Sequence, residues 1–148
     1  MSPAASPSAI LPTESTLGVT VSSPEACTIV REILSRLGDK WSVVAIVMLG
    51  DQSLRFGELL RRGHGVSQRM LTQTLRQLER DGLVWRKVTP TIPVTVEYGL
   101  TDLGRDLLVI LRPFFEWTVE HAPEIEASRA DFDVRMAALR GSTADAAD

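Results

Sequence analysis

The chain has 148 residues and a mass of 16.3 kDa, which is the size of one ordinary domain. Apolar residues make up 44% of it and charged residues 24%, which excludes a disordered or fibrous chain. No apolar run reaches the roughly 18 residues of a membrane span, so we expect no membrane contact. Cys27 is the single cysteine, which excludes an internal disulfide and a cysteine-based zinc cage within one chain. We expect no secretory signal, and therefore the reducing cytoplasm as the compartment.

The formal net charge of -3 hides a local excess of basic residues. Between Arg55 and Lys87 the chain has eight basic residues against three acidic ones. The basic residues are Arg55, Arg61, Arg62, Arg69, Arg76, Arg80, Arg86 and Lys87. A basic segment in an acidic protein favours a local site for a polyanion, with the acids elsewhere limiting nonspecific binding. The alternative is an ordinary solvated surface that is rich in arginine.

Composition divides the chain into one folded part between two tails. Ser, Pro, Ala and Thr dominate residues 1–26, and residues 141–148 have a similar composition. Such segments have little apolar surface to bury, which predicts that both are disordered. We therefore expect one folded domain over residues 27–140.

Two helices are expected at the start of this domain. An apolar stripe of helical period predicts a helix over residues 28–37, ended by Gly38 in a left-handed conformation. Trp41 continues the stripe, which favours a place in the core over a ligand contact. The run 42–49 is apolar on all sides and is interpreted as a buried helix with Ser42 as its N-cap. A buried strand is the alternative, because the run is short and rich in β-branched residues.

The next segment has the pattern of two short helices joined by a turn that contains glycine. An amphipathic helix is predicted over residues 56–62, and Gly63-His64-Gly65 then interrupts the helical pattern. Ser67 is the predicted N-cap of a second helix, and Gly82 follows the end of that helix. The apolar stripe of the second helix consists of Leu71, Leu75 and Leu78.

The remaining elements are a hairpin and a long apolar segment. The apolar period changes to two over residues 83–88 and 94–100, which predicts two strands with a proline-containing connection. Thr101 is expected to cap a long helix that Pro113 kinks or splits. A further amphipathic helix is predicted around residues 125–139.

This order of elements is that of a winged helix-turn-helix, in which the second helix can lie in the major groove of DNA and the hairpin forms a wing. We predict an α+β, mostly α, winged helix-turn-helix fold with additional N- and C-terminal helices for dimerisation. When the leucine stripe is buried, the exposed face of the second helix carries basic and amide side chains, and no acid precedes Glu79. The predicted DNA-contacting residues of this helix are Ser67, Gln68, Arg69, Thr72, Gln73 and Arg76. The alternative is an ordinary solvated helix face, since Gln and Arg favour helices in any protein.

Three stretches of the sequence resemble the HxlR-type winged-helix transcriptional regulators, a bacterial group related in fold to the MarR regulators. The stretches are Cys27–Ile33 with Leu37–Trp41, Arg55–Leu59 with Val66–Val84, and Val96–Gly104. The resemblance covers about residues 27–120 and implies a cytoplasmic, homodimeric, DNA-binding regulator. Family wings usually have arginine or lysine where this chain has Thr95. This departure implies a weaker contact of the wing with DNA, for which Arg86 and Lys87 are the candidate substitutes.

The resemblance also implies a role for Cys27, since some members of the family sense thiol-reactive or oxidising compounds through a cysteine at this place. A lone cysteine restricts such a switch to an intersubunit disulfide or to a mixed adduct with a small thiol or electrophile. One alternative is a buried, unreactive Cys27 that acts as a small apolar residue. The other is regulation by a small effector that binds in the dimer interface.

The run 107–117 is too apolar for a helix with one buried face, so a second face is expected to meet a partner chain. The predicted anchors of this dimer interface are Leu111, Phe114, Phe115 and Trp117. A two-fold dimer would present two recognition helices to an inverted repeat in DNA.

The predicted function is therefore sequence-specific binding of double-stranded DNA by a homodimer that represses transcription. We expect no enzymatic activity, because no Cys–His pair or acid dyad is recognisable from the spacing of residues. Two isolated histidines predict no metal site, and no cofactor is expected. A winged helix that has lost DNA binding and serves protein assembly is the alternative function.

Overall fold

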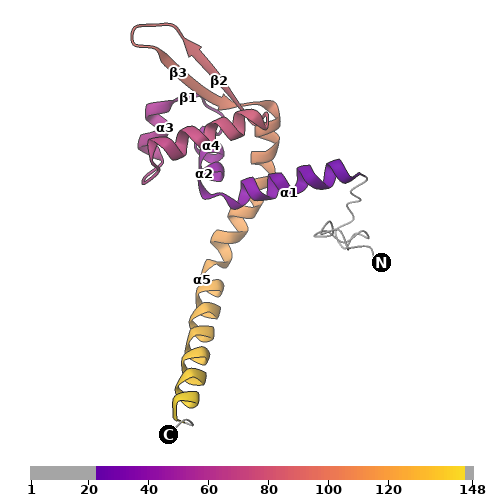
Figure 1. The fold of residues 1–148 in the computed structure, drawn as a ribbon, viewed down its shortest axis with the longest axis vertical. Helices are drawn as coiled ribbons and strands as arrows, with labels where there is room; N and C mark the ends of the chain where they lie inside the picture. The colour runs from indigo at the N-terminus through magenta and orange to yellow at the C-terminus, as the bar shows by residue number, and fades with distance from the viewer. Residues whose placement is uncertain (1–22, 146–148) are drawn as a thin grey trace, which may run out of the picture. The chain divides into compact units, whose positions relative to one another are not determined.

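The computed structural model describes residues 23–145, with side chains described as far as Gly141. The described part contains five helices and three strands (Figure 1). They are α1 (Pro24–Gly38), α2 (Lys40–Leu49), β1 (Leu54–Arg55), α3 (Phe56–Arg62), α4 (Gln68–Arg80), β2 (Val84–Thr89), β3 (Thr95–Leu100) and α5 (Asp102–Asp145). The described residues divide into two compact units, residues 23–101 and residues 102–145. Most of the two expected tails lies outside the described residues.

α1 begins earlier than the sequence pattern predicted, so residues 24–26 belong to a helix and not to a tail. Ser23 is its N-cap, since Ser23 Oγ accepts a hydrogen bond from the Ala26 N–H at 3.2 Å. Pro24 follows at the first helical position, where its missing N–H has no cost. Gly38 is the last residue of α1 and is not left-handed, because the chain turns at Asp39 in an extended conformation.

α2 is a helix, as predicted, but it begins at Lys40 and its N-cap is Asp39, not Ser42. The Asp39 carboxylate accepts hydrogen bonds from the Ser42 N–H at 3.0 Å and from Ser42 Oγ at 2.7 Å. A carboxylate forms stronger, charge-assisted bonds with these donors than a hydroxyl would, so the helix starts one turn earlier. Ser42 itself is buried.

α3 and α4 confirm the predicted helix-turn-helix. Ser67 caps α4, since Ser67 Oγ accepts a hydrogen bond from the Met70 N–H at 3.1 Å. At the other end of α4, the Leu83 N–H donates to the Leu78 carbonyl at 2.9 Å and the Gly82 N–H donates to the Glu79 carbonyl at 3.0 Å. This is a Schellman motif, and it requires a left-handed residue at Gly82, whose φ is 74°.

β2 and β3 form the predicted hairpin, with Val84 opposite Leu100 at its base and Thr89 opposite Thr95 near its tip. The sequence did not predict β1, which pairs with β3 and completes an antiparallel sheet in the order β1-β3-β2. A strand of two residues is too short to show an alternating pattern, so its pairing with a distant strand is what defines it.

The core of the first unit lies between α2, α4 and the inner face of the sheet. The predicted stripe of Leu71, Leu75 and Leu78 is fully buried there, together with Ile46 and Leu49 of α2. Burial of this stripe leaves the opposite face of α4 at the surface.

α5 is one continuous helix of 44 residues that contains both Pro113 and Pro123. Pro113 therefore does not split the helix, which was one of the two expected outcomes, and the helix predicted around residues 125–139 is a continuation of α5. A proline inside a helix removes one backbone hydrogen bond and costs about 3 kcal/mol. α5 also continues to Asp145, into the segment that was expected to be a tail. No helix over residues 23–145 has both the length and the apolar character needed to span a membrane.

Candidate nucleic-acid interface

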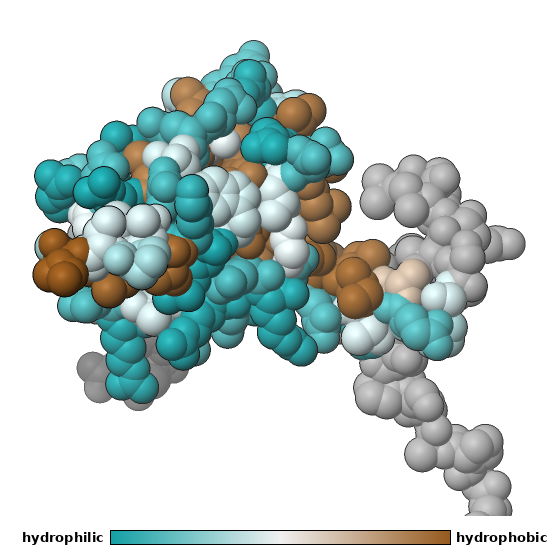
Figure 2. All heavy atoms as spheres, turned by 90° about the horizontal axis from the view of Figure 1, so that it is seen from above, coloured by the Kyte–Doolittle hydropathy of each residue, from teal (hydrophilic) through white to brown (hydrophobic). Residues whose placement is uncertain are grey.

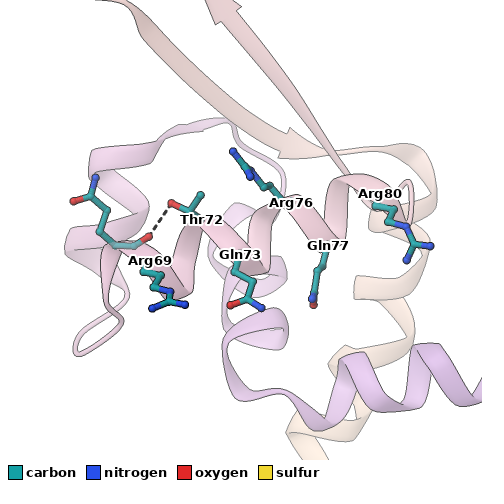
Figure 3. Close-up of a pocket in the computed structure, with 7 residues that line it drawn as sticks. Arg69, Thr72, Gln73, Arg76, Gln77 and Arg80 are labelled. Carbon is teal, nitrogen blue, oxygen red and sulfur yellow. Dashed lines mark hydrogen bonds between the residues drawn. The ribbon is translucent and has the colours of Figure 1, made fainter.

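The exposed face of α4 forms an open hollow between long polar side chains, called here the α4 hollow (Figure 3). Seven residues line it: Gln68, Arg69, Thr72, Gln73, Arg76, Gln77 and Arg80. Their spacings of three and four residues place them on one side of the helix, opposite the buried leucines. None of the seven is acidic, although Glu79 lies on the same helix.

The α4 hollow contains the five predicted contact residues that follow the N-cap Ser67. Gln77 and Arg80 also line the α4 hollow and extend the same face by one turn, although neither was among the predicted contact residues. Each lies four residues after a predicted residue, Gln73 or Arg76, so the helical period was the signal that could have found them.

The α4 hollow is rich in hydrogen-bond donors, and its glutamines add acceptor oxygens. An arginine can donate two parallel bonds to guanine, and a glutamine can bind both edge groups of adenine. The Thr72 hydroxyl donates to the Gln68 carbonyl at 2.8 Å, which holds this side chain against the helix (Figure 3). The surface as a whole suits base edges and phosphates, which are rich in acceptors and negative charge.

The two basic wing residues point to opposite faces of the hairpin. Arg86 lies opposite Tyr98 in the ladder, and Lys87 lies opposite Glu97. Side chains alternate between the faces of a strand, so Arg86 shares the face of the buried Tyr98, whereas Lys87 shares the other face with Glu97. A single DNA strand along one face of the wing would meet only one of them.

A second hollow, the wing hollow, connects the wing with the N-terminal half of α4. Gln68 and Thr72 contribute to both hollows, and Thr95 of the wing lines the wing hollow with them. Arg55 and Arg61 also line it, and neither was among the predicted contact residues. Arg55 and Arg61 belong to the basic segment between Arg55 and Lys87, which is the feature of the sequence that could have indicated them.

The tip of the wing is uncharged, since residues 88–96 contain no acidic or basic side chain. Ile92 and Val94 are exposed there. The Thr91 hydroxyl donates to the Pro93 carbonyl at 2.9 Å and lies 2.9 Å from the Thr95 hydroxyl. Hydrophobic patches of the surface are separated by hydrophilic side chains in the view of Figure 2.

Cys27 lies in the first turn of α1 and is half-buried, outside both hollows. Its backbone N–H makes the helical bond to the Ser23 carbonyl at 3.1 Å. Hydrogen bonds from the Glu25 backbone and from the Ser23 hydroxyl lower the pKa of the Glu25 carboxyl, two residues before Cys27.

The predicted interface anchors of α5 differ in exposure. Leu111 is 6% exposed and Phe115 is half-buried, whereas Phe114 and Trp117 are 59% and 52% exposed. Trp117 stacks on His121 with ring centroids 4.8 Å apart. Of the four predicted anchors, Phe114 and Trp117 therefore expose the most side-chain surface.

Comparison with known proteins agrees with this architecture. The family described as HxlR-like helix-turn-helix matches residues 36–126. An uncharacterized HTH-type transcriptional regulator from Methanothermobacter thermautotrophicus is 44% identical over 84 residues, which are 57% of this chain and 64% of that protein. The match therefore spans less than two thirds of that relative's length.

Two solved structures are also similar. The putative transcriptional regulator ytfH from Salmonella typhimurium superposes with a TM-score of 0.64 and 37% identity, covering 68% of this chain and 90% of that one. The redox regulator HypR in its reduced form has a TM-score of 0.62 and 37% identity, covering 67% of this chain and 98% of that one. The present chain belongs to the HxlR-like helix-turn-helix family and is a transcriptional regulator of the helix-turn-helix type.

Proposed function

We propose that the protein is a homodimeric repressor that reads an inverted-repeat operator by placing α4 in the major groove of double-stranded DNA. The observation that carries the proposal is the α4 hollow. Its lining is rich in hydrogen-bond donors and contains no acidic residue, and the opposite face of α4 is buried. The buried leucine stripe and the two helix caps hold this surface in place before DNA binds. Such a regulator would act in the cytoplasm.

Two copies of the chain would form the DNA-binding unit. The exposed aromatic side chains Phe114 and Trp117 of α5, and the exposed Ile29 and Leu34 of α1, support an interface with a second copy. A two-fold dimer presents two α4 helices, so successive half-sites would be separated by one helical turn of DNA, roughly 34–36 Å, or a multiple of it.

Regulation through Cys27 is the second part of the proposal. It is supported by the position of Cys27 in the first turn of a helix and by the similarity to HypR, a redox regulator. An oxidant such as diamide would take two electrons and two protons from the Cys27 thiols of two subunits, which then join in a disulfide. A mixed adduct of Cys27 with a small thiol or electrophile is the other chemistry open to a lone cysteine.

A gel shift tests both parts. The wild-type protein and Cys27→Ser would be titrated onto the DNA upstream of the gene, with and without diamide, with a scrambled duplex as control. We expect both proteins to bind the upstream DNA and diamide to release only the wild type.

Each other outcome changes the proposal in a defined way. Equal binding without release by diamide would contradict the thiol switch and favour a noncovalent effector. No binding to the upstream fragment would be followed by selection from random-sequence DNA. If that selection also recovers no duplex, the DNA-binding proposal is wrong and the protein-assembly function replaces it.

A further inference from the structure

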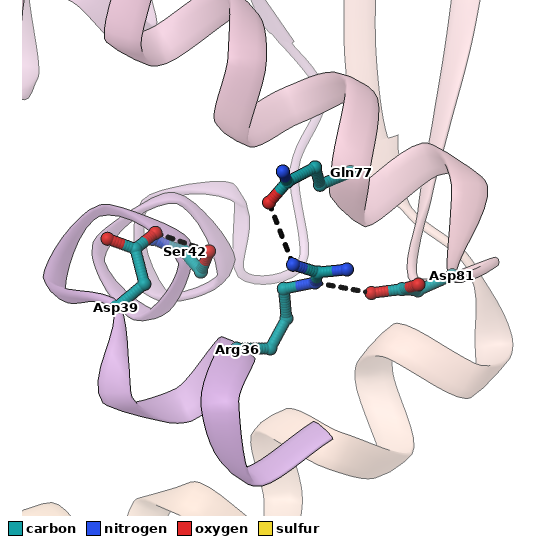
Figure 4. Close-up of polar contacts among 5 residues, drawn as sticks. All are labelled: Arg36, Asp39, Ser42, Gln77 and Asp81. Atoms are coloured by element: carbon teal, nitrogen blue, oxygen red, sulfur yellow. Dashed lines mark hydrogen bonds and ion pairs between the residues drawn. The ribbon is translucent and has the colours of Figure 1, made fainter. Parts of the chain in front are cut away.

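Arg36, in the last turn of α1, reaches across to α4 and holds two of its residues (Figure 4). Arg36 Nε donates to Asp81 Oδ2 at 2.7 Å, and Arg36 Nη1 donates to Gln77 Oε1 at 2.8 Å. The side chains of Arg36 and Asp81 are only 20% and 16% exposed. One planar guanidinium group therefore clamps two residues that lie one turn apart on α4.

The chemistry of arginine decides how the Gln77 carboxamide is oriented. A guanidinium group has donors but no acceptor, so the Gln77 atom that faces Arg36 must be its oxygen. The Gln77 amino group, with its two N–H donors, is then free to serve another acceptor. Gln77 lines the α4 hollow, so this donor belongs to the proposed DNA-facing surface.

The other contact of the clamp fixes the end of α4. Asp81 is the C-cap residue of α4, where the helix turns toward the wing. Arg36 is charged at neutral pH like any arginine, and the hydrogen bond to Asp81 raises its pKa further. A lysine amine lacks the planar fork that serves two separate acceptors in this arrangement.

We infer that Arg36 is a positioning residue for DNA reading, which orients the Gln77 amino group toward DNA and fixes the C-terminal end of α4. The inference rests on the proposed function and deepens it, because it assigns an effect on DNA affinity to a residue that lines neither hollow. Arg36 acts through Gln77 and Asp81 and does not itself contact DNA.

The test uses the full chain and a duplex selected by the wild-type protein from random-sequence DNA. Dissociation constants would be measured by fluorescence anisotropy for Arg36→Met, Gln77→Ala and the double variant. We expect Arg36→Met to weaken binding roughly three- to tenfold, the range of one lost hydrogen bond. We expect the loss in the double variant to be smaller than the product of the two single losses, because both changes remove the contact between Arg36 and Gln77.

A matched control separates positioning from a general effect on stability. Ser42→Ala removes the buried hydrogen bond from Ser42 Oγ to Asp39, which Figure 4 shows beside the clamp, and leaves all charges in place. We expect it to lower the melting temperature without changing the dissociation constant. Arg36→Lys, which keeps one donor group, should recover part of the affinity and replaces Arg36→Met if that variant does not fold.

Two outcomes would overturn the inference alone. One is a lower melting temperature for the Arg36 variant with unchanged DNA affinity, as in the control. The other is multiplication of the two single losses in the double variant, which would show that Arg36 and Gln77 act independently. Failure of the wild type to select any duplex would overturn the proposed function and this inference together.

Discussion

Trp85 lies directly opposite Gly99 in the ladder between β2 and β3, and its indole ring occupies the place of a side chain at Gly99. A β carbon on Gly99 would overlap ring atoms Cζ2 and Cε2 of Trp85. Glycine is required here for close approach, since it has no β carbon. The pair lies at the base of the wing, one position from the buried pair Val84 and Leu100, and therefore fixes how the wing leaves the core.

Gly99→Ala is expected to destabilise the protein by about 1–3 kcal/mol, because the added methyl group displaces the Trp85 ring or the strand. Urea unfolding followed by circular dichroism measures the change. Gly57→Ala is the matched control, since a β carbon at Gly57 in α3 meets no atom within 4 Å. Adding Trp85→Val to Gly99→Ala should recover stability relative to Gly99→Ala; a further loss would contradict the steric explanation.

Arg69→Ala and Arg76→Ala should each weaken binding to the selected duplex by ~1–3 kcal/mol if the arginine reads a base. Titrations against that duplex and a scrambled one distinguish base reading from phosphate contact. Equal losses on both duplexes would make the residue a phosphate contact. Arg135→Ala, which removes the same charge from an exposed position of α5, is the control and should leave affinity nearly unchanged.

Thr95→Arg should strengthen DNA binding and steepen its dependence on salt. Thr95 lines the wing hollow beside α4, and the tip around it has no charge. One new phosphate contact changes the slope of log K against log salt concentration by about -0.9. Binding measured over a series of salt concentrations gives this slope. An unchanged slope would mean that the wing does not approach a phosphate at this position.

Simultaneous replacement of Phe114 and Trp117 by serine should shift the protein from dimer toward monomer. Both aromatic side chains are more than half exposed, and large aromatic residues dominate the energetics of protein interfaces. Sedimentation velocity over a concentration series measures the shift, with Glu120→Gln on the same helix as control. A double variant that remains as dimeric as the wild type would exclude these residues as anchors.

The sequence pattern predicted the elements that depend on local interactions. The bounds of α3, the Ser67 cap and the left-handed Gly82 are set by residues within a few positions of one another. The same applies to the polar face of α4, because the helical period alone separates it from the leucine stripe. The order of these elements predicted a winged helix-turn-helix; the family match confirmed the helix-turn-helix and the structure shows the hairpin that follows it.

Other features depend on contacts between segments that are distant in the sequence, and only the tertiary structure shows them. β1 exists because Leu54 and Arg55 pair with β3, and no periodicity over two residues could indicate this. The Arg36 clamp joins residues more than forty positions apart, and the wing hollow brings Thr95 beside Gln68 and Thr72. The local sequence determines where a helix can begin and which of its faces is apolar. Contacts between side chains that are distant in the sequence form only when the chain packs, because packing determines which donor meets which acceptor.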